Sequence, residues 1–435
     1  MEQYLFNSKV PITDEYDLIV FGGGSAGCIA AIQAGRIGIK TALVEKNGVL
    51  GGTAVVASVN FPGLFHAWGN QVIAGIGWEV IRETERRGGA VLPDFTVPYK
   101  NNQHPRHQIS VNRFVYSSVL DDLCLDAKVV LRFHEMPVHI DSDEHWRYVL
   151  VAGKSGLSCL RAKKIIDATG DANVAGLMGY EREKSKSLQP GTLIYNLSGY
   201  SLEQVDQVQL HGIYKQSLAA GEIFETDHVP GGVPFWRELI TAGGNNMHIP
   251  GIDGSTSQLR SEAELKARQS LSRIYRLLRK VPGCEQLQVN YFANECGIRE
   301  TSRIVGEARV TCEAYTSGYV WPDAVCYSFY PIDVHSDSGN TIDIRPLAEG
   351  IVPTIPYGAL VPQGSEHLLV SGRCISGDRE ANSAYRVQAS CMATGQAAGA
   401  AAAIAVQNNS SVRQIDLDEL RSVLAKHQAI VPLKR

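Results

Sequence analysis

A glycine-rich turn near the start of the chain carries the clearest chemical signal in the sequence. Beginning at Gly22, the chain reads Gly-Gly-Gly-Ser-Ala-Gly, which fits the pattern G-x-G-x-x-G. In that pattern the first glycine permits a tight turn, the second lets a pyrophosphate approach the backbone, and the third lets a helix pack on a strand. These glycines are Gly22, Gly24 and Gly27, with Ser25 and Ala26 between the last two. The pattern predicts a phosphate site at a helix N-terminus, which offers N–H groups and partial positive charge.

An acidic residue stands at the distance that this chemistry requires. Glu45 lies eighteen residues after Gly27 and ends a short apolar run. A carboxylate there accepts hydrogen bonds from the ribose hydroxyls of an adenosine and repels a 2′-phosphate. A glycine turn alone often has only a structural role, but the turn and Glu45 together predict a bound dinucleotide.

The elements around these residues read as one β-α-β unit. Tyr16–Phe21 is an apolar run typical of a strand, and Thr41–Glu45 is a second one. Between them, Ala26–Ala34 has the apolar spacing of a helix. About 30 residues is the usual length of such a unit.

Five further segments along the chain resemble flavoproteins and follow one another in the expected order. They are Lys46–Ala54, Ile165–Asp171, Gly297–Gly306, Tyr330–His335, and the pair Gly372–Ser376 with Cys391–Gly399. With the glycine turn, they make the chain resemble the broad FAD-dependent oxidoreductase family, related to fumarate-reductase and glutathione-reductase-like flavoproteins. The resemblance covers about residues 16–406.

The resemblance implies an α/β fold with two interleaved parts. A Rossmann-type, glutathione-reductase-like FAD-binding domain with a β-meander is expected at 12–177 and 347–407. A mixed α+β substrate or cap domain at 178–346 would interrupt it, and a helical tail would follow at 408–435. The strand-like runs assigned to the meander are Val129–Phe133, Pro137–Ile140, Arg147–Ala152 and Ser158–Ala162, returning to Lys164–Thr169.

The resemblance also implies which residues hold the cofactor. They are Gly22, Gly24, Ser25, Ala26, Gly27, Glu45, Lys46, Gly51, Gly52, Thr53, Ala168, Thr169, Gly170, Asp171, Gly372, Arg373, Arg386, Ala393, Thr394 and Gly395. A helix beginning near Ala393 would aim its N–H groups at the N1/C2 edge of the flavin and stabilise the reduced form. Alternatively, this segment is an ordinary buried helix whose Gly395 and Gly399 allow close packing.

The sequence lacks motifs that several related flavoprotein families carry, and this narrows the possible reaction classes. Disulfide reductases of this fold carry a cysteine pair after Gly-Gly-Thr, but here Ala54–Val59 contains none. The middle of the chain has no second G-x-G-x-x-G, so we expect no dedicated NAD(P)H domain. Flavin-dependent halogenases carry two tryptophans one residue apart, and the five tryptophans of this chain include no such pair. Covalent flavoproteins of the fumarate-reductase group have a histidine shortly after the glycine pair, and none lies near Thr53, so we expect FAD to be held non-covalently.

Histidine and arginine supply the candidates for catalysis. His335 ends a strand-like run and is the first choice for proton transfer, because histidine titrates near neutral pH. Asp333, two residues before it, faces the same side of a strand and can orient it. Arg299 and Arg303 offer fixed positive charge for a carboxylate or for reduced flavin. All three catalytic candidates also have a scaffold interpretation. Nothing in the sequence selects among the loop histidines His66, His104, His107 and His248.

Composition limits the functional classes. The 435 residues are 20% charged with a formal net charge of −4, which gives no support to nucleic-acid or membrane-surface binding. Nine scattered cysteines without a Cys-x-x-Cys spacing argue for reduced thiols and against metal centres. The first ten residues lack the features of a secretory signal, and the apolar run Ala397–Val406 is too short for a membrane span, so a cytoplasmic protein is expected.

These observations lead to one hypothesis and two alternatives. The leading hypothesis is an enzyme that exchanges a hydride between flavin N5 and a small organic substrate. The second is a flavin monooxygenase that uses external NAD(P)H. The third is a flavin-bearing subunit that passes electrons to a protein partner. The oligomeric state stays open.

Overall fold

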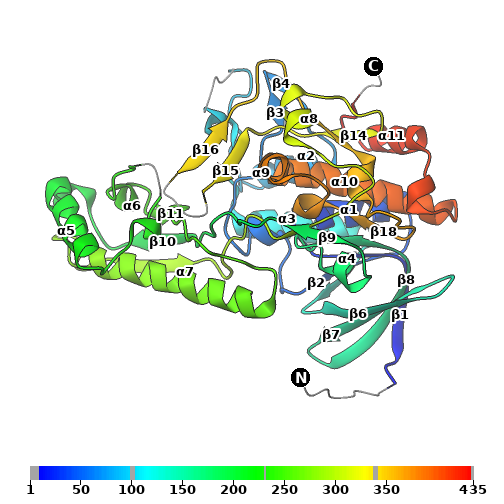
Figure 1. The fold of residues 1–435 in the computed structure, drawn as a ribbon, viewed down its shortest axis with the longest axis horizontal. Helices are drawn as coiled ribbons and strands as arrows, with labels where there is room; N and C mark the ends of the chain where they lie inside the picture. The colour runs from blue at the N-terminus through cyan, green and yellow to red at the C-terminus, as the bar shows by residue number, and fades with distance from the viewer. Residues whose placement is uncertain (1–8, 98–102, 230–231, 337–340, 433–435) are drawn as a thin grey trace.

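The computed structural model describes residues 9–97, 103–229, 232–336 and 341–432. Most of the N-terminal segment in which no secretory signal was found therefore lies outside the described residues. Two lobes are visible in Figure 1, a larger body on the right and a green, mostly helical extension on the left.

A parallel sheet forms the centre of the body. Its order is β5-β2-β1-β8, and β18 pairs with the other side of β8. These strands are β1 (Ile12–Phe21), β2 (Thr41–Glu45), β5 (Val130–Phe133), β8 (Gly156–Asp167) and β18 (Leu368–Val370). The second half of β1 and all of β2 are buried, because helices and loops cover both faces of a parallel sheet. The predicted β-α-β unit is confirmed, with both strands and the intervening helix in place.

Two long helices pack against each other beside the sheet. They are α1 (Ser25–Ile37) and α10 (Gln388–Gln407), drawn side by side in Figure 1. A Cβ on Gly395 or Gly399 would lie 2.2 Å from the carbonyl oxygen of Ala26 or Ala30, so only glycine permits this close approach. Helix α10 is long and apolar enough to cross a membrane, but 89% of its most apolar window is buried inside the protein.

An antiparallel meander extends the same sheet. It contains β6 (Met136–Ser142), β7 (Arg147–Gly153) and the first half of β8. Two corrections concern this region. Strand β5 was expected in the meander but pairs in parallel with β2, because it follows a helical crossover. The two runs around Lys163 form one strand, β8. It pairs with β1 along most of its length, and on its other side with β7 first and with β18 at its end.

The extension has a hydrophobic core of its own. Its buried apolar residues run from Leu193 to Ile298. Its main elements are β10 (Tyr195–Ser198), α5 (Gln207–Ala219), α6 (Arg237–Ile240), β11 (Gly243–Gly244), α7 (Ser257–Leu278) and β12 (Gln288–Phe292). Buried apolar residues from Ile304 to Leu347 join the core of the body, so this second core is shorter than the predicted 178–346 segment.

Other elements surround the two cores. Helices are α2 (Ile76–Arg86), α3 (Arg113–Asp126), α4 (Asn173–Leu177), α8 (Cys312–Ser317), α9 (Arg379–Tyr385) and α11 (Leu417–Lys426). Short strands are β3 (His66–Ala67), β4 (Asn70–Gln71), β9 (Arg182–Lys184), β13 (Ser302–Ile304), β14 (Ala324–Tyr327), β15 (Ile332–His335), β16 (Ile342–Arg345) and β17 (Thr354–Pro356). The predicted C-terminal helix packs on the body through Leu420 and Leu424.

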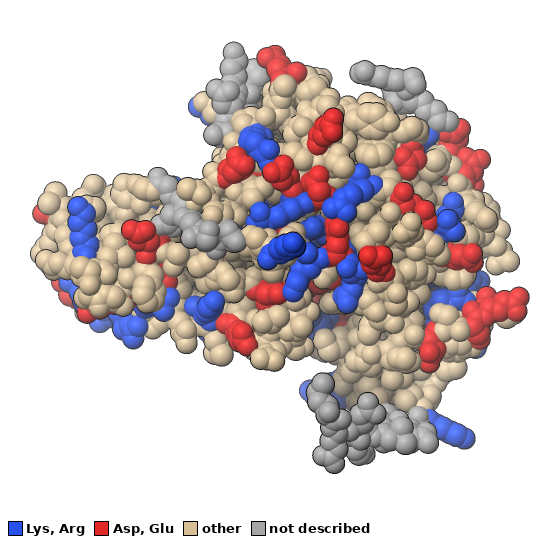
Figure 2. Space-filling view, in the orientation of Figure 1, with Lys and Arg blue, Asp and Glu red and all other residues tan. Residues whose placement is uncertain are grey.

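Charge is mixed over the visible face. In Figure 2, lysine and arginine side chains gather near the centre of the face with aspartate and glutamate among them. This face therefore presents no broad patch of one sign.

Candidate functional site

The first glycine turn gives each of its glycines a different geometry. Gly22 has φ +102°, and a Cβ there would lie 2.5 Å from the oxygen of Ala168. A Cβ on Gly27 would lie 1.9 Å from the oxygen of Gly22. A Cβ on Gly24 would meet nothing nearer than Cα of Gly52, at 3.9 Å. Protein atoms therefore fill the space at Gly22 and Gly27, whereas the space at Gly24 is open to a ligand.

The second glycine turn lies directly against the first. The N–H of Gly51 donates to the oxygen of Gly23 at 2.8 Å, and a Cβ on Gly52 would be 2.8 Å from Cα of Gly24. Gly51 has φ +107°. Helix α1 begins here without a side-chain cap on its N-cap residue, Gly24. Its first N–H groups therefore remain available, as a phosphate site requires.

Glu45 is buried at the end of β2, beneath both turns. Its two carboxylate oxygens accept hydrogen bonds from the N–H of Gly23 at 2.7 Å and of Asn47 at 2.8 Å. Burial is the main influence on its pKa and raises it. A carboxylate has further lone pairs, so Glu45 can bind the glycine turn and a ribose hydroxyl together. The neighbouring Lys46 forms an ion pair with Glu295 at 2.7 Å, and Thr53 lies in the short helix η1 (Gly52–Ala54).

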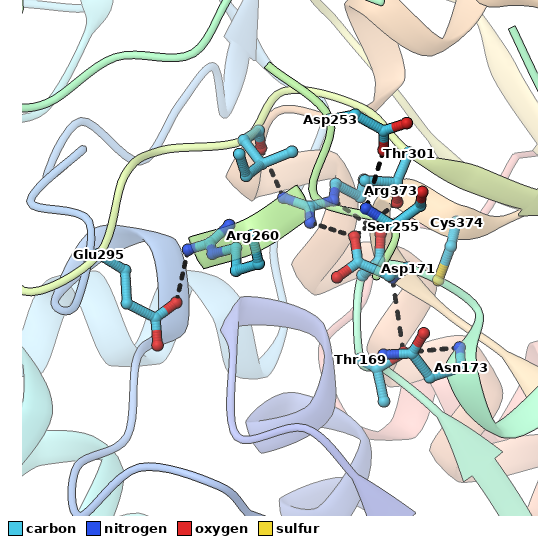
Figure 3. Close-up of polar contacts among 12 residues, drawn as sticks. Thr169, Asp171, Asn173, Asp253, Ser255, Arg260, Glu295, Thr301, Arg373 and Cys374 are labelled. Atoms are coloured by element: carbon cyan, nitrogen blue, oxygen red, sulfur yellow. Dashed lines mark hydrogen bonds and ion pairs between the residues drawn. The ribbon is translucent and has the colours of Figure 1, made fainter. Parts of the chain in front are cut away.

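A third side of the site is built around Asp171 and Arg373, shown in Figure 3. Arg373 donates to Asp171 at 2.6 Å and to the carbonyl oxygens of Gly170 and Ile298, both at 2.7 Å. Thr301 also donates to Asp171, at 2.6 Å. The loop after β8 is thereby joined to the loop before β13. Ala168 packs against the first glycine turn, and Thr169 donates its hydroxyl to the buried Asp167 at 2.6 Å.

The start of α10 corrects one expectation. The helix begins at Gln388, five residues before Ala393, so Ala393, Thr394 and Gly395 lie inside it. Gly395 packs on α1, and Thr394 accepts a hydrogen bond from the N–H of Gly372 at 3.1 Å. Ala393 lines a small cavity on another side of the helix. The predicted N–H groups at residues 393–395 are therefore inside the helix rather than at its N-terminus.

The actual N-terminus of α10 lies beside the glycine turns. Its N-cap residue, Val387, provides no side-chain cap. The side chain of Gln388 bonds to Ser25 at 3.3 Å and donates to the oxygen of Val59 at 2.6 Å. The two uncapped helix ends, of α1 and α10, are therefore joined by one side chain.

A buried polar cluster adjoins the start of α10, because Arg386, the residue before Val387, lies 3.8 Å from Asp333. His335 at the end of β15 is 8% exposed and His248 is 6% exposed. Nδ1 of His335 lies 2.9 Å from Nε2 of His248, and its Nε2 lies 3.3 Å from Asp333. The predicted pairing of His335 with Asp333 is present. Burial, followed by the charge of Arg299, lowers the pKa of His335 to about 4 and that of His248 to about 2.

Charges on this cluster are only partly balanced. Burial opposes ionisation of Asp333, but the His335 hydrogen bond and the charges of Arg386 and Arg299 outweigh it and hold its pKa well below the usual range. Burial and the nearby Arg386 lower the pKa of Arg299 to about 10, so it stays cationic at neutral pH. Arg299 donates to the oxygen of Pro190, and Arg386 lies 3.8 Å from Asp333. Two cations and one carboxylate leave a single positive charge.

Arg303 does not join this cluster. It is 4% exposed and donates to the oxygen of Gly377 at 3.0 Å and to Ser185 at 3.1 Å. It also pairs with Glu300 at 3.5 Å. Its donors are directed at protein groups, which makes Arg303 a scaffold residue.

Several buried polar atoms in the cluster lack a partner among the described residues. They are Nδ1 of His248, Nε2 of Gln189, Nε of Arg386 and Nδ1 of His104. A buried polar atom without a partner is costly, and native proteins rarely leave one without a reason. Such a group of atoms is suited to hold a polar ligand beside the glycine turns.

Sequence reasoning missed Gln388, Gln189 and His248. Gln388 was hidden because the helix start was placed too late. His248 and His335 are 87 residues apart, and no local pattern around either predicts their contact.

The arrangement fits a dinucleotide with a substrate beside it. Open space at Gly24, two uncapped helix ends and Glu45 provide donors and an acceptor for phosphates and ribose. The polar cluster supplies charge and neutral imidazoles. Among the described residues, no group of three or more His, Cys, Asp or Glu side chains is arranged for a metal ion.

Comparison with known proteins identifies a family that matches most of the chain. A family model described as FAD dependent oxidoreductase matches residues 17–424. Curated relatives match over short segments. Dihydrolipoyl dehydrogenase of Trypanosoma brucei brucei is 47% identical over 64 residues, 14% of this chain and 13% of that protein. The mitochondrial enzyme of Schizosaccharomyces pombe is 49% identical over 51 residues, 12% and 10% of the respective chains.

Solved structures align over more of the chain at low identity. The p-nitrophenol 4-monooxygenase PnpA of Pseudomonas putida DLL-E4 has a TM-score of 0.46 and 13% identity, covering 95% of this chain and 87% of its own. A geranylgeranyl bacteriochlorophyll reductase-like protein of Thermoplasma acidophilum has a TM-score of 0.44 and 13% identity, covering 95% and 82%.

Proposed function

Because this chain belongs to the FAD-dependent oxidoreductase family, we propose that it exchanges a hydride between non-covalently held FAD and a small organic substrate. One observation carries the proposal. The two glycine turns and the starts of α1 and α10 lie together, and a buried cluster with unpartnered polar atoms adjoins the start of α10 through Arg386, which directly precedes Val387 and lies 3.8 Å from Asp333. A cofactor site and a substrate site are thereby contiguous.

The proposal assigns the cofactor to this chain's residues as follows. The open backbone at Gly24 and the first N–H groups of α1 bind the pyrophosphate, and Glu45 binds the adenosine ribose. The start of α10 and the segment around Val59 flank the ring system. When bound, FAD supplies a two-electron acceptor or donor that handles hydride at N5.

The buried cluster binds and orients the substrate and moves a proton. Arg299 and Arg386 provide fixed charge, and Asp333 holds the imidazole of His335. Both histidines are neutral at pH 7 because burial and the arginines lower their pKa values. Neutral imidazole accepts a proton at one nitrogen and donates at the other, which suits proton transfer that accompanies hydride transfer.

The proposal is tested on purified protein under anaerobic conditions. We expect yellow protein whose flavin absorbance bleaches with one class of small metabolites. Colourless protein that cannot be reconstituted with FAD would contradict the proposal. Rapid NAD(P)H oxidation with oxygen uptake would favour the monooxygenase alternative, and a stable complex with a protein acceptor would favour the electron-transfer alternative.

We also propose that the protein works in a reducing, cytosolic compartment. It is supported by the nine cysteines, which are free thiols, eight of them buried.

A further inference from the structure

The hydrogen-bond chain Asp333–His335–His248 determines where its protons lie. Asp333 is ionised and therefore only accepts hydrogen bonds. Nε2 of His335, 3.3 Å from that carboxylate, must carry a proton and donate it. His335 is neutral at pH 7, so its Nδ1 carries a lone pair and accepts. Nε2 of His248, 2.9 Å away, must then be the donor.

The hydrogen-bond chain ends at Nδ1 of His248, which carries no proton. With its proton on Nε2, His248 keeps a lone pair on Nδ1, and this atom has no partner among the described residues. His248 is 6% exposed, so water does not freely reach the lone pair. His335, by contrast, has Nδ1 directed at His248 and Nε2 directed at Asp333. His335 has no nitrogen left with which to touch a substrate.

A second unpartnered atom lies on the same assembly. The side-chain oxygen of Gln189 accepts a hydrogen bond from the backbone N–H of His335 at 3.1 Å. That bond fixes the amide, so the NH₂ group of Gln189 is its free end, and Nε2 has no partner among the described residues. Gln189 is 2% exposed. His335 thus connects one buried acceptor without a partner to one buried donor without a partner.

We propose that His248 is the catalytic base, that it takes the hydroxyl proton of an alcohol substrate, and that Gln189 donates to the oxygen of that hydroxyl. The inference rests on the proposed function, which supplies FAD as the oxidant. A hydroxyl group is both donor and acceptor, and it satisfies both unpartnered atoms. His335 and Asp333 are positioning residues, because they act only through His248.

The step balances as an alcohol oxidation. The O–H bond breaks and its proton moves to Nδ1 of His248. The carbinol C–H bond breaks, its electron pair leaves with the hydrogen as hydride to the oxidant, and a C=O double bond forms.

Charges around His248 keep its lone pair available. Arg299 and His335 face it and lower its pKa, and the Asp333 carboxylate opposes them. Arg386, beside Asp333, adds a further positive charge. His248 is therefore unprotonated across the neutral range, and Asp333 is the neighbouring group that favours the protonated form that His248 takes in the step.

The first test measures tautomers and needs no substrate. Long-range nitrogen–proton correlation spectra of histidine-labelled holoenzyme should show His248 protonated at Nε2 with a bare Nδ1. In His335→Phe, which removes the acceptor, we expect His248 to populate the Nδ1-protonated form. Protonation at Nδ1 in the wild type, or an unchanged tautomer in His335→Phe, would overturn the proposal.

The second test measures flavin reduction by a panel of probes, namely isopropanol, cyclohexanol, lactate and their amine counterparts. We expect bleaching by alcohols, and in His248→Gln a rate lower by about a hundredfold or more at unchanged FAD content. His139→Gln, an exposed histidine on β6, is the matched control and should keep the wild-type rate. Bleaching by amines alone, or an unchanged rate in His248→Gln, would reject the assignment while leaving the proposed function standing. A protein without FAD would instead reject the proposed function.

Discussion

Two polar regions flank the glycine turns, and they differ in how fully their atoms are paired. Around Asp171, Glu300, Arg303 and Arg373, ion pairs and backbone carbonyls engage the side chains. Around Asp333, His335, His248 and Arg299, comparable burial leaves Nδ1 of His248, Nε2 of Gln189 and Nε of Arg386 without partners in the described part of the chain. In the first region, the unpartnered buried atoms lie instead on side chains at its border, namely Glu183, Arg379 and Asn382. We interpret this difference as the difference between a scaffold and a binding site, although the sequence predicted site residues in both regions, Asp171 and Arg373 in the first and Arg299 and His335 in the second.

Breaking the paired region should have the largest effect on stability. Arg373→Leu removes three hydrogen bonds and leaves Asp171 without its cation. Loss of one partner of a buried pair costs about 3–5 kcal/mol. Arg373 is partly exposed in its side chain, so we expect the lower end of that range, measured by urea unfolding. A loss below about 1 kcal/mol would show that the paired region is not a scaffold.

Acid should destabilise the protein through the unpaired region. Both histidines have lowered pKa values in the folded protein, so the unfolded chain binds their protons first as the pH falls below about 6.5. The stabilising contribution is complete above that pH and is lost as the pH falls toward about 4, where His335 titrates in the folded protein. We expect a slope of up to about 1.4 kcal/mol per pH unit from each histidine, and therefore at most about 2.7 kcal/mol per pH unit from the pair. The double variant His248→Gln, His335→Gln should flatten the slope, and an identical slope would contradict the assignment.

A milder variant removes a single hydrogen bond from the paired region. Thr301→Val keeps the shape of the side chain and removes the 2.6 Å hydrogen bond to Asp171. We expect about 1.5 kcal/mol of lost stability, the lower end for a hydrogen bond to a charged group, because Asp171 keeps Arg373 as a partner. Bound FAD should remain, because Arg373 still holds the loop.

The unpaired region should tolerate the loss of an arginine. Arg299→Leu removes a buried cation whose hydrogen-bond partner among the described residues is one backbone oxygen, that of Pro190, so we expect a change in stability within about 0.5 kcal/mol. Flavin reduction by substrate should nevertheless slow, because the cluster loses fixed charge. The comparison would be contradicted if Arg299→Leu strongly destabilised the protein while the fraction that stayed folded reduced its flavin at the wild-type rate.

Sequence predicted this molecule well where the signal is local. The bounds of β2 and the existence of β1, α1 and the C-terminal helix α11 follow from local sequence patterns. The pairing of β5 with β2 is non-local and was missed. The start of α10 was misplaced because Val387 has no side-chain capping signal. His248 was left among four equivalent loop histidines, since its role depends on a contact across 87 residues.

The glycines of the cofactor region also show that local signals are predictable from the sequence and that long-range contacts are not. Gly22, Gly27 and Gly51 occupy turns whose positive φ or tight contacts require glycine, and the local pattern identified them. For Gly395, the sequence left two interpretations open, contact with the flavin or close packing of helices, and the structure places it against α1. A glycine motif alone does not distinguish these two roles.

FAD binding by Gly24→Val tests the central claim most directly. Gly24 has φ −84°, which valine also adopts, and the space beside it is open, so the apoprotein should unfold at the wild-type urea midpoint. The side chain would occupy the place that we assign to the pyrophosphate. We predict that the folded variant binds no FAD in an equilibrium titration. Wild-type affinity for FAD in this variant would contradict the account.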